Sequence, residues 1–256
     1  MSTFVLKLIA IVSMTIDHIG AAIGTTCVDG KFYLSGLLSE NVYNLFRCIG
    51  RIAFPIYCYL IVEGYYYTKN LKKYIIRLIA FAIISQIPFS LAFFKSATNF
   101  KDLNVYFTLM FGLICIYLYD TAKQRYEECK NNGSTAYLYT IGYPLLIFAI
   151  MIVSVIINTD YSAFGIMLIM LFYILRTDIT KPLNDKDNAK KFIKLFIAIA
   201  VITLIFSNTA ELFGLLALIP IAFHNHKKGP SIKYVFYAYY PVHLLVLYGI
   251  FIKLHG

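Results

Sequence analysis

Residues Phe4–Gly24 read FVLKLIAIVSMTIDHIGAAIG, an apolar run interrupted by single lysine, aspartate and histidine residues. A helix that crosses a hydrocarbon core of about 30 Å needs about 20 predominantly apolar residues. The run is longer than the apolar part of a signal peptide, and no small-residue cleavage site follows it. We therefore expect it to be a retained membrane span.

The composition of the whole chain supports a membrane protein. Of its 256 residues, 60% are hydrophobic and 14% are charged, whereas soluble domains are roughly half apolar and about a quarter charged. This excludes a soluble globular fold, disorder and collagen. The cysteines form no C-x-x-C pair and are odd in number, which argues against a disulfide scaffold; they are Cys27, Cys48, Cys58, Cys115 and Cys129. We predict an all-α polytopic membrane helix bundle that forms one transmembrane domain over residues 1–256.

Apolar runs along the chain predict about nine transmembrane helices, with eight to ten allowed because two of the runs are short. The predicted spans are Phe4–Gly24, Leu45–Thr68, Lys73–Phe94, Asn104–Tyr119, Tyr137–Asn158, Tyr161–Arg176, Lys191–Ser207, Glu211–His224 and Tyr234–Leu254.

The net charge of +10 comes from 23 basic and 13 acidic residues. The basic residues gather after every second span: Lys69, Lys72 and Lys73, then Lys123, Arg125 and Lys130, then five between Arg176 and Lys191, then Lys227, Lys228 and Lys233. This alternation follows the positive-inside rule and predicts a cytoplasmic N-terminus and an external C-terminus. The charge therefore does not indicate a nucleic-acid partner. The bias toward Lys, Ile, Asn and Tyr suggests an AT-rich bacterium, so we expect a multi-pass protein of the bacterial inner membrane.

Several ionisable or amide side chains fall inside the predicted spans, where they are costly and usually face a cavity or a partner. They are Asp17, His18, Arg47, Arg51, Glu63, Arg77, Gln86, Asn104 and His243. At 1.5 Å per residue, His18 and Arg51 both lie about 9 Å below the same membrane surface, and Arg47 lies about 3 Å below it. We expect these groups to share one depth.

Arg47 and Arg51 are four residues apart, so both project from one helix face. They suit a carboxylate or phosphate ligand, or they hold Asp17 ionised; the alternative for Arg47 is snorkelling to the interface. Asp17 and His18 are sequence neighbours and point about 100° apart, so they cannot pair with each other. We interpret His18 as a residue of proton chemistry.

His243, Glu63 and the pair His224 and His226 each have a simpler alternative role. Pro241 frees a backbone carbonyl that the His243 imidazole could satisfy. Glu63 could form a salt bridge with Arg77. His224 and His226 lie in a predicted cytoplasmic loop without a third ligand at metal spacing, so we predict headgroup contact and no metal site.

Motifs of soluble catalytic domains are absent: there is no Walker loop, G-x-G-x-x-G after a strand, H-E-x-x-H or G-x-S-x-G. Four other stretches resemble a known family in order along the chain. They are LKLIAIVSMTIDHIGAAI, then CIGRIAFPIYCYLIVEGYYYTKNLKKYIIRLIAFAIISQIPF, then NVYFTLMFGL, and finally YAYYPVHLLVLYGI. Together they resemble the TraX family, a resemblance carried by D-H-I-G, by G-R-I-A-F-P with V-E-G, and by Y-P-V-H-L.

The resemblance implies a polytopic acetyltransferase that draws on acetyl-CoA, similar in logic to other families that move acetyl groups across membranes. The acceptor it implies is an amine or hydroxyl, on a peptide or pilin N-terminus, an envelope glycan or a small amine. In this reading the catalytic residues are His18, His243, Asp17 and Arg51, and no metal takes part.

Acetyl-CoA would be held from the cytoplasmic side, where a basic rim that includes Lys73 and Arg77 suits its phosphates. Further predicted contacts to acetyl-CoA are Arg47, Glu63, Gln86 and Asn104. No cysteine stands beside a candidate base, so we expect direct transfer to the acceptor. The alternative is a proton-coupled transporter or exporter, which would also place Asp, His and Arg in spans, although no inverted repeat is visible.

Overall fold

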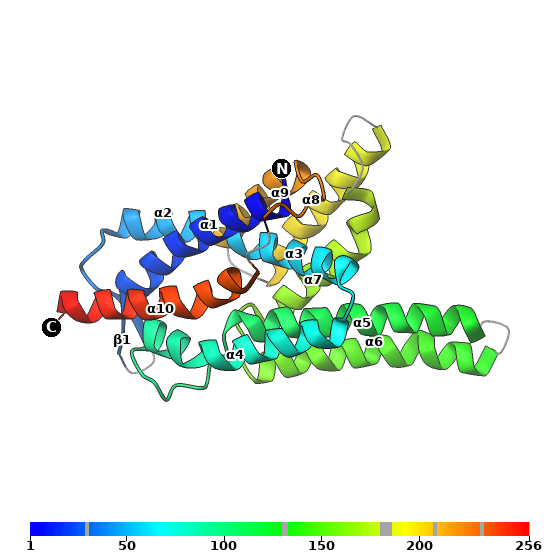
Figure 1. The fold of residues 1–256 in the computed structure, drawn as a ribbon, viewed down its shortest axis with the longest axis horizontal. Coiled ribbons are helices and arrows are strands. Elements are labelled where there is room, and N and C mark those ends of the chain that lie inside the picture. The colour runs from blue at the N-terminus through cyan, green and yellow to red at the C-terminus, as the bar shows by residue number, and fades with distance from the viewer. Residues whose placement is uncertain (29–30, 130–132, 180–185, 207–208, 231–232, 256) are drawn as a thin grey trace.

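The computed structural model describes residues 1–256 except 29–30, 130–132, 180–185, 207–208, 231–232 and 256 (Figure 1). The described chain is a helical bundle with one short β-hairpin, which confirms the predicted fold class. Its elements are α1 Thr3–Ile23, β1 Thr25–Val28, β2 Lys31–Leu34, α2 Glu40–Gly50, α3 Ala53–Tyr67, α4 Leu71–Phe94, α5 Val105–Cys129, α6 Gly133–Ile156, α7 Ser162–Ile179, α8 Lys186–Phe206, the 3₁₀ helix η1 Thr209–Ala217, α9 Leu218–Ala222 and α10 Lys233–His255.

Within the described residues, six helical segments are long and apolar enough to cross a membrane. They are Thr3–Ile23, Glu40–Tyr67, Leu71–Phe94, Val105–Cys129, Tyr139–Ile156 and Tyr234–Leu254. The sixth and eighth predicted spans correspond to shorter apolar helices, Ser162–Leu175 and Glu211–Ala222. The seventh corresponds to α8, whose first half carries several lysines. By length and composition, the described residues therefore contain fewer full-length spans than the nine that the sequence predicted.

The first and last helices, α1 and α10, pack side by side and run in the same direction (Figure 1). Phe4 contacts Phe236, Thr15 bonds to Tyr239, and His18 bonds to His243, so residue numbers rise together along the two helices. The start of α1 and the end of α10 consequently lie at opposite ends of this helix pair (Figure 1).

The second predicted span is not one continuous helix, because it breaks at Arg51 and Ile52 between α2 and α3. Pro55 explains the break: its ring clashes with the carbonyl four residues earlier, which is that of Arg51, and it has no N–H to donate to that carbonyl. The break places the Arg51 side chain at a junction that faces α1.

Gly50 lets α1 approach this junction. A Cβ at Gly50 would lie 2.1 Å from the Cβ of Asp17, so only glycine fits there. Elsewhere α5 and α6 form a long antiparallel pair that extends beyond the other helices at the end opposite the C-terminus (Figure 1). The core lies among α1, α3, α5 and α7, where Leu6, Ile56 and Leu113 are fully buried.

Candidate active site

Asp17 on α1 connects to both arginines of the α2–α3 junction. Its carboxylate accepts hydrogen bonds from Arg47 at 2.8 Å and from Arg51 at 3.4 Å. The Asp17 and Arg51 side chains are 13% and 9% exposed, whereas Arg47 is 27% exposed. Asp17 therefore pairs with the arginines and, within the part of the chain that the structure describes, not with His18.

Arg51 also binds two residues that the sequence analysis did not single out. Its guanidinium donates to Glu211 at 2.5 Å and to the Tyr161 hydroxyl at 3.2 Å. Next to Tyr161, outside the helices, burial raises the pKa of Asp160 to about 6, although Arg51 acts to lower it. Glu211 begins a short apolar helix, and Tyr161 immediately precedes another, Ser162–Leu175. An acidic or phenolic residue at the start of an apolar run was the signal that could have identified them.

His18 and His243 form a pair across α1 and α10. Nδ1 of His18 lies 2.7 Å from Nε2 of His243, and Nδ1 of His243 lies 2.8 Å from the Tyr239 carbonyl oxygen. A carbonyl oxygen only accepts, so the proton of neutral His243 is assigned to Nδ1 and its Nε2 is an acceptor. His18 must then donate from its own Nδ1, which leaves Nε2 of His18 with a free lone pair.

The alternative that His243 satisfies the carbonyl freed by Pro241 does not hold. That carbonyl, four residues before Pro241, belongs to Tyr237, and the Tyr106 hydroxyl donates to it at 3.2 Å. His243 instead orients His18.

Asp17, His18, Arg47 and Arg51 meet at a cavity of about 300 Å³, which we call the polar cavity. Asp160 and Tyr161 line it as well, together with aromatic side chains of α3 and α4 such as Phe54 and Phe93. Four residues predicted from two separate stretches of sequence thus lie around one space. His243 does not line this cavity and reaches it through His18.

A second cavity of about 560 Å³, which we call the basic cavity, lies between the first halves of α1 and α4, the second half of α3 and the start of α10. Its wall includes five basic residues and one acidic residue: Lys7, Lys69, Lys73, Arg77, Lys228 and Glu63. Lys73, Arg77 and Glu63 were predicted to contact acetyl-CoA, whereas Lys7 was not identified from the sequence.

The two cavities share Tyr57 as a wall residue. Along α1, the basic cavity is lined by Lys7 and the polar cavity by His18. Lys7 and His18 are eleven residues apart, which is roughly 16 Å along the helix axis. The cavities therefore lie in line along the helix axis, with Tyr57 between them.

Gln86 and Asn104 are buried and bonded to protein groups, away from both cavities. The Asn104 amide donates to the Gln86 carbonyl oxygen at 2.9 Å and to the Ala82 carbonyl at 2.7 Å, and Gln86 donates to the Asp102 carbonyl at 2.7 Å. They join α4 to the start of α5. The structure therefore gives no support for a contact between either residue and acetyl-CoA.

Glu63 and Arg77 both line the basic cavity but have different neighbours. Nδ1 of His226 lies 3.0 Å from Glu63 Oε2, while the Arg77 guanidinium lies over the Tyr74 ring at 5.5 Å. Within the described chain, the buried Nε of Arg77 has no hydrogen-bond partner. The considered Glu63–Arg77 salt bridge is thus replaced by a carboxylate–imidazole pair.

Comparison with known proteins agrees with the sequence resemblance. The family model described as "TraX protein" matches residues 2–251. A relative from Dichelobacter nodosus, named "Probable fimbrial assembly protein FimC, serogroup H1", is 31% identical over 122 residues, an alignment that covers 45% of each chain. No solved structure matches. The family match spans nearly the whole helical bundle, and the chain belongs to the TraX family.

Proposed function

We propose that this TraX-family membrane protein is an acetyltransferase that moves an acetyl group from acetyl-CoA to an amine or hydroxyl acceptor. The observation that carries the proposal is the pair of cavities in line: a basic one, suited to phosphates, and a polar one with an oriented histidine, with Tyr57 in the wall of both. Acetyl-CoA has the same two parts, a phosphate-bearing nucleotide and a long narrow arm that ends in the thioester.

The basic cavity is the proposed site for the nucleotide part of acetyl-CoA. Its wall carries five cationic side chains and one carboxylate, that of Glu63, so the net charge of the wall is positive. Hydrogen bonds between cationic side chains and phosphate oxygens belong to the stronger class of hydrogen bonds. The Nε of Arg77 supplies a buried donor that the described protein groups leave unused. The thioester arm would extend past Tyr57 into the polar cavity.

His18 is the proposed general base. Among the described residues, no group hydrogen-bonds its Nε2, and His18 lines the polar cavity. In the reaction, the acceptor amine or hydroxyl attacks the acetyl carbonyl carbon while Nε2 takes its proton. The new C–N or C–O bond forms, the C–S bond breaks, and the proton passes to the leaving thiolate to give CoA thiol. Positioned acid–base groups typically contribute 10²–10⁴-fold to the rate.

The arginines are the proposed stabilisers of the carbonyl oxygen as it becomes negative. Arg51 is held by Asp17, Glu211 and Tyr161, so its position is fixed but its donors are largely used. Arg47 has one carboxylate partner and is more exposed, so it has more freedom to donate to substrate. Both therefore belong to the site, Arg51 chiefly as the residue that keeps the carboxylates in place.

Direct transfer is favoured over an acyl-enzyme intermediate. The structure describes the side chains of Cys48, Cys58, Cys115 and Cys129, and none of these four lines either cavity. A covalent acyl carrier would need a nucleophile beside the base.

The acceptor is proposed to be the N-terminal amine of a surface-fibre subunit. The support is the name of the Dichelobacter nodosus relative, a probable fimbrial assembly protein. In the inner membrane of a bacterium, the positive-inside pattern would place the basic cavity at the cytoplasmic end of the protein. Acetyl-CoA is made in the cytoplasm, so it would reach the cavity from that side.

The test uses purified protein in lipid nanodiscs with labelled acetyl-CoA and a peptide amine. We expect CoA thiol and acetylated peptide in equal amounts, with turnover lowered about 10²–10⁴-fold by His18→Ala. Lys73→Ala, on the basic cavity, should raise KM for acetyl-CoA, whereas Lys72→Ala, next to it but off the cavity wall, should not. Unchanged turnover in folded His18→Ala would contradict the proposed base. Transport of a solute without thiol release would favour the proton-coupled transporter.

A further inference from the structure

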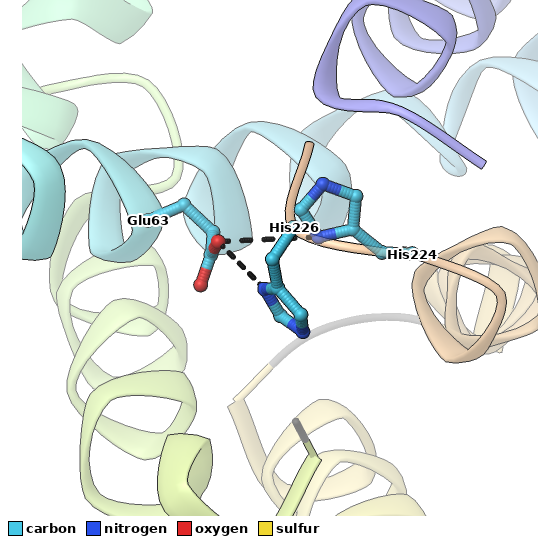
Figure 2. A group of neighbouring side chains, drawn as sticks. All are labelled: Glu63, His224 and His226. Atoms are coloured by element: carbon cyan, nitrogen blue, oxygen red, sulfur yellow. Dashed lines mark hydrogen bonds and ion pairs between the residues drawn. The ribbon is translucent and has the colours of Figure 1, made fainter. Parts of the chain in front are cut away.

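Three side chains from distant parts of the sequence converge beside the basic cavity (Figure 2). Glu63 comes from α3, and His224 and His226 lie in the segment after α9. One ligand atom from each lies within 4.8 Å of the other two. We propose that Glu63, His224 and His226 bind one divalent transition-metal ion of the zinc type, independently of the proposed acetyl transfer.

The spacing of the cluster fits a single ion. Two ligands of a tetrahedral zinc ion, each about 2.0–2.1 Å from the metal, lie roughly 3.4 Å apart. Oε2 of Glu63 lies 3.0 Å from Nδ1 of His226 and 3.9 Å from Nδ1 of His224. These two separations bracket the expected value, so small side-chain rotations would place all three atoms around one metal.

The chemistry of the cluster also fits zinc. Two imidazole nitrogens and one carboxylate oxygen form a ligand set that zinc uses in proteins, with the fourth position left for another ligand. The side chains of Glu63 and His224 are only 4% and 1% exposed, and His226 is 22% exposed. Buried carboxylates are paired or coordinate metals, so the buried oxygen of Glu63 beside two imidazoles suits a divalent cation.

The surroundings hold His224 in a fixed orientation. The Thr3 hydroxyl lies 3.0 Å from Nε2 of His224, the ring nitrogen that does not face Glu63. Metal-bound histidines are commonly oriented in this way through their second nitrogen. On the other side, the Tyr59 hydroxyl lies 2.8 Å from Nδ1 of His224. A metal ion at Nδ1 would replace this hydrogen bond, leaving the Tyr59 oxygen close to the fourth position.

The site lies where the N-terminus joins the segment after α9. The N–H groups of Thr3 and Phe4 donate to the carbonyls of Lys227 and Lys228 at 2.9 and 3.2 Å. Lys228 and Glu63 also line the basic cavity. A metal ion held by Glu63 and the two histidines would therefore attach this segment to α3 and fix one edge of the basic cavity.

The experiment measures metal content directly. Full-length protein in detergent is treated with chelator, dialysed against Zn²⁺ or Co²⁺ alone, and analysed for bound metal by elemental analysis and, for Co²⁺, by the visible absorption of a four-coordinate complex. We expect one equivalent in the unaltered protein. Glu63→Gln, which keeps the shape of the side chain, and His226→Ala should each weaken binding at least about tenfold.

His18→Ala is the matched control, because it removes an imidazole from the other close histidine pair. It should keep one equivalent of metal with unchanged affinity. Thermal melting and a monodisperse elution profile establish that each variant is folded. Less than stoichiometric metal in the folded unaltered protein would overturn the proposal, as would undiminished Co²⁺ absorption in both Glu63→Gln and His226→Ala.

Discussion

Asp17 is the residue on which the charge balance of the polar cavity depends. It holds Arg47 and Arg51 together while itself only 13% exposed. Removing one partner of a buried ion pair typically costs about 3–5 kcal/mol, because an uncompensated charge remains. Arg47 keeps some contact with solvent, so we expect Asp17→Ala to lower the free energy of unfolding by about 3 kcal/mol, the lower end of that range.

The measurement is reversible unfolding in mixed detergent micelles, with Glu128→Ala as the control. Glu128 pairs with Arg125 at 3.2 Å on an exposed part of α5, where both side chains are more than half exposed. Exposed pairs contribute little to stability, so this variant should unfold like the unaltered protein. Equal stability of the Asp17 and Glu128 variants would contradict the ion-pair network described above.

At this scale, sequence reasoning identified Asp17, His18, Arg47 and Arg51 in the wall of the polar cavity but missed Asp160 and Tyr161. Helical depth placed His18 and Arg51 at one level, and spacing placed Arg47 and Arg51 on one face, because both follow from regular helix geometry. The partnership of Glu63 with His226 could not be derived, because it joins residues 163 positions apart. The same limit concealed the contact between Arg51 and Glu211.

At the scale of elements, the contact of α1 with the α2–α3 junction depends on Gly50. A methyl group there would lie 2.1 Å from the Asp17 Cβ, so Gly50→Ala must push the two segments apart. We expect a loss of thermal stability and a lower rate of the proposed acetyl transfer, since Asp17 and Arg51 would separate.

Gly142→Ala is the matched control. Gly142 also lies inside a helix, α6, and a Cβ added there would meet nothing within 4 Å. Replacing such a glycine by alanine usually stabilises a helix by about 0.5–1 kcal/mol. If Gly50→Ala were as stable as Gly142→Ala in thermal melting, close packing at the junction would not be needed.

The element boundaries show where apolar patterning alone is insufficient. The run Leu45–Thr68 predicted one span, and the structure has one candidate span there, Glu40–Tyr67. Apolar patterning did not show that the helix within this span is interrupted between α2 and α3, where Pro55 removes a hydrogen bond to Arg51. The runs at α7 and at η1 with α9 are apolar but short. Hydropathy indicates that such segments are buried, but it does not distinguish burial in lipid from burial in protein.

For the whole molecule, the parallel arrangement of α1 and α10 predicts that the chain termini lie on opposite sides of the membrane. With the basic loops on the cytoplasmic side, alkaline phosphatase fused after Leu254 should be active outside the cell. The same enzyme fused after Gly229, before α10, should be inactive. Equal phosphatase activity at the two positions would contradict the predicted orientation and an odd number of crossings.

The central claim is that one acetyl-CoA molecule occupies both cavities. The most direct measurement is a structure of the protein in nanodiscs with CoA bound at saturation. We predict the phosphates beside Lys73 and Arg77 and the sulfur beyond Tyr57, facing Nε2 of His18. CoA bound at another surface, or with its sulfur directed away from His18, would contradict the claim.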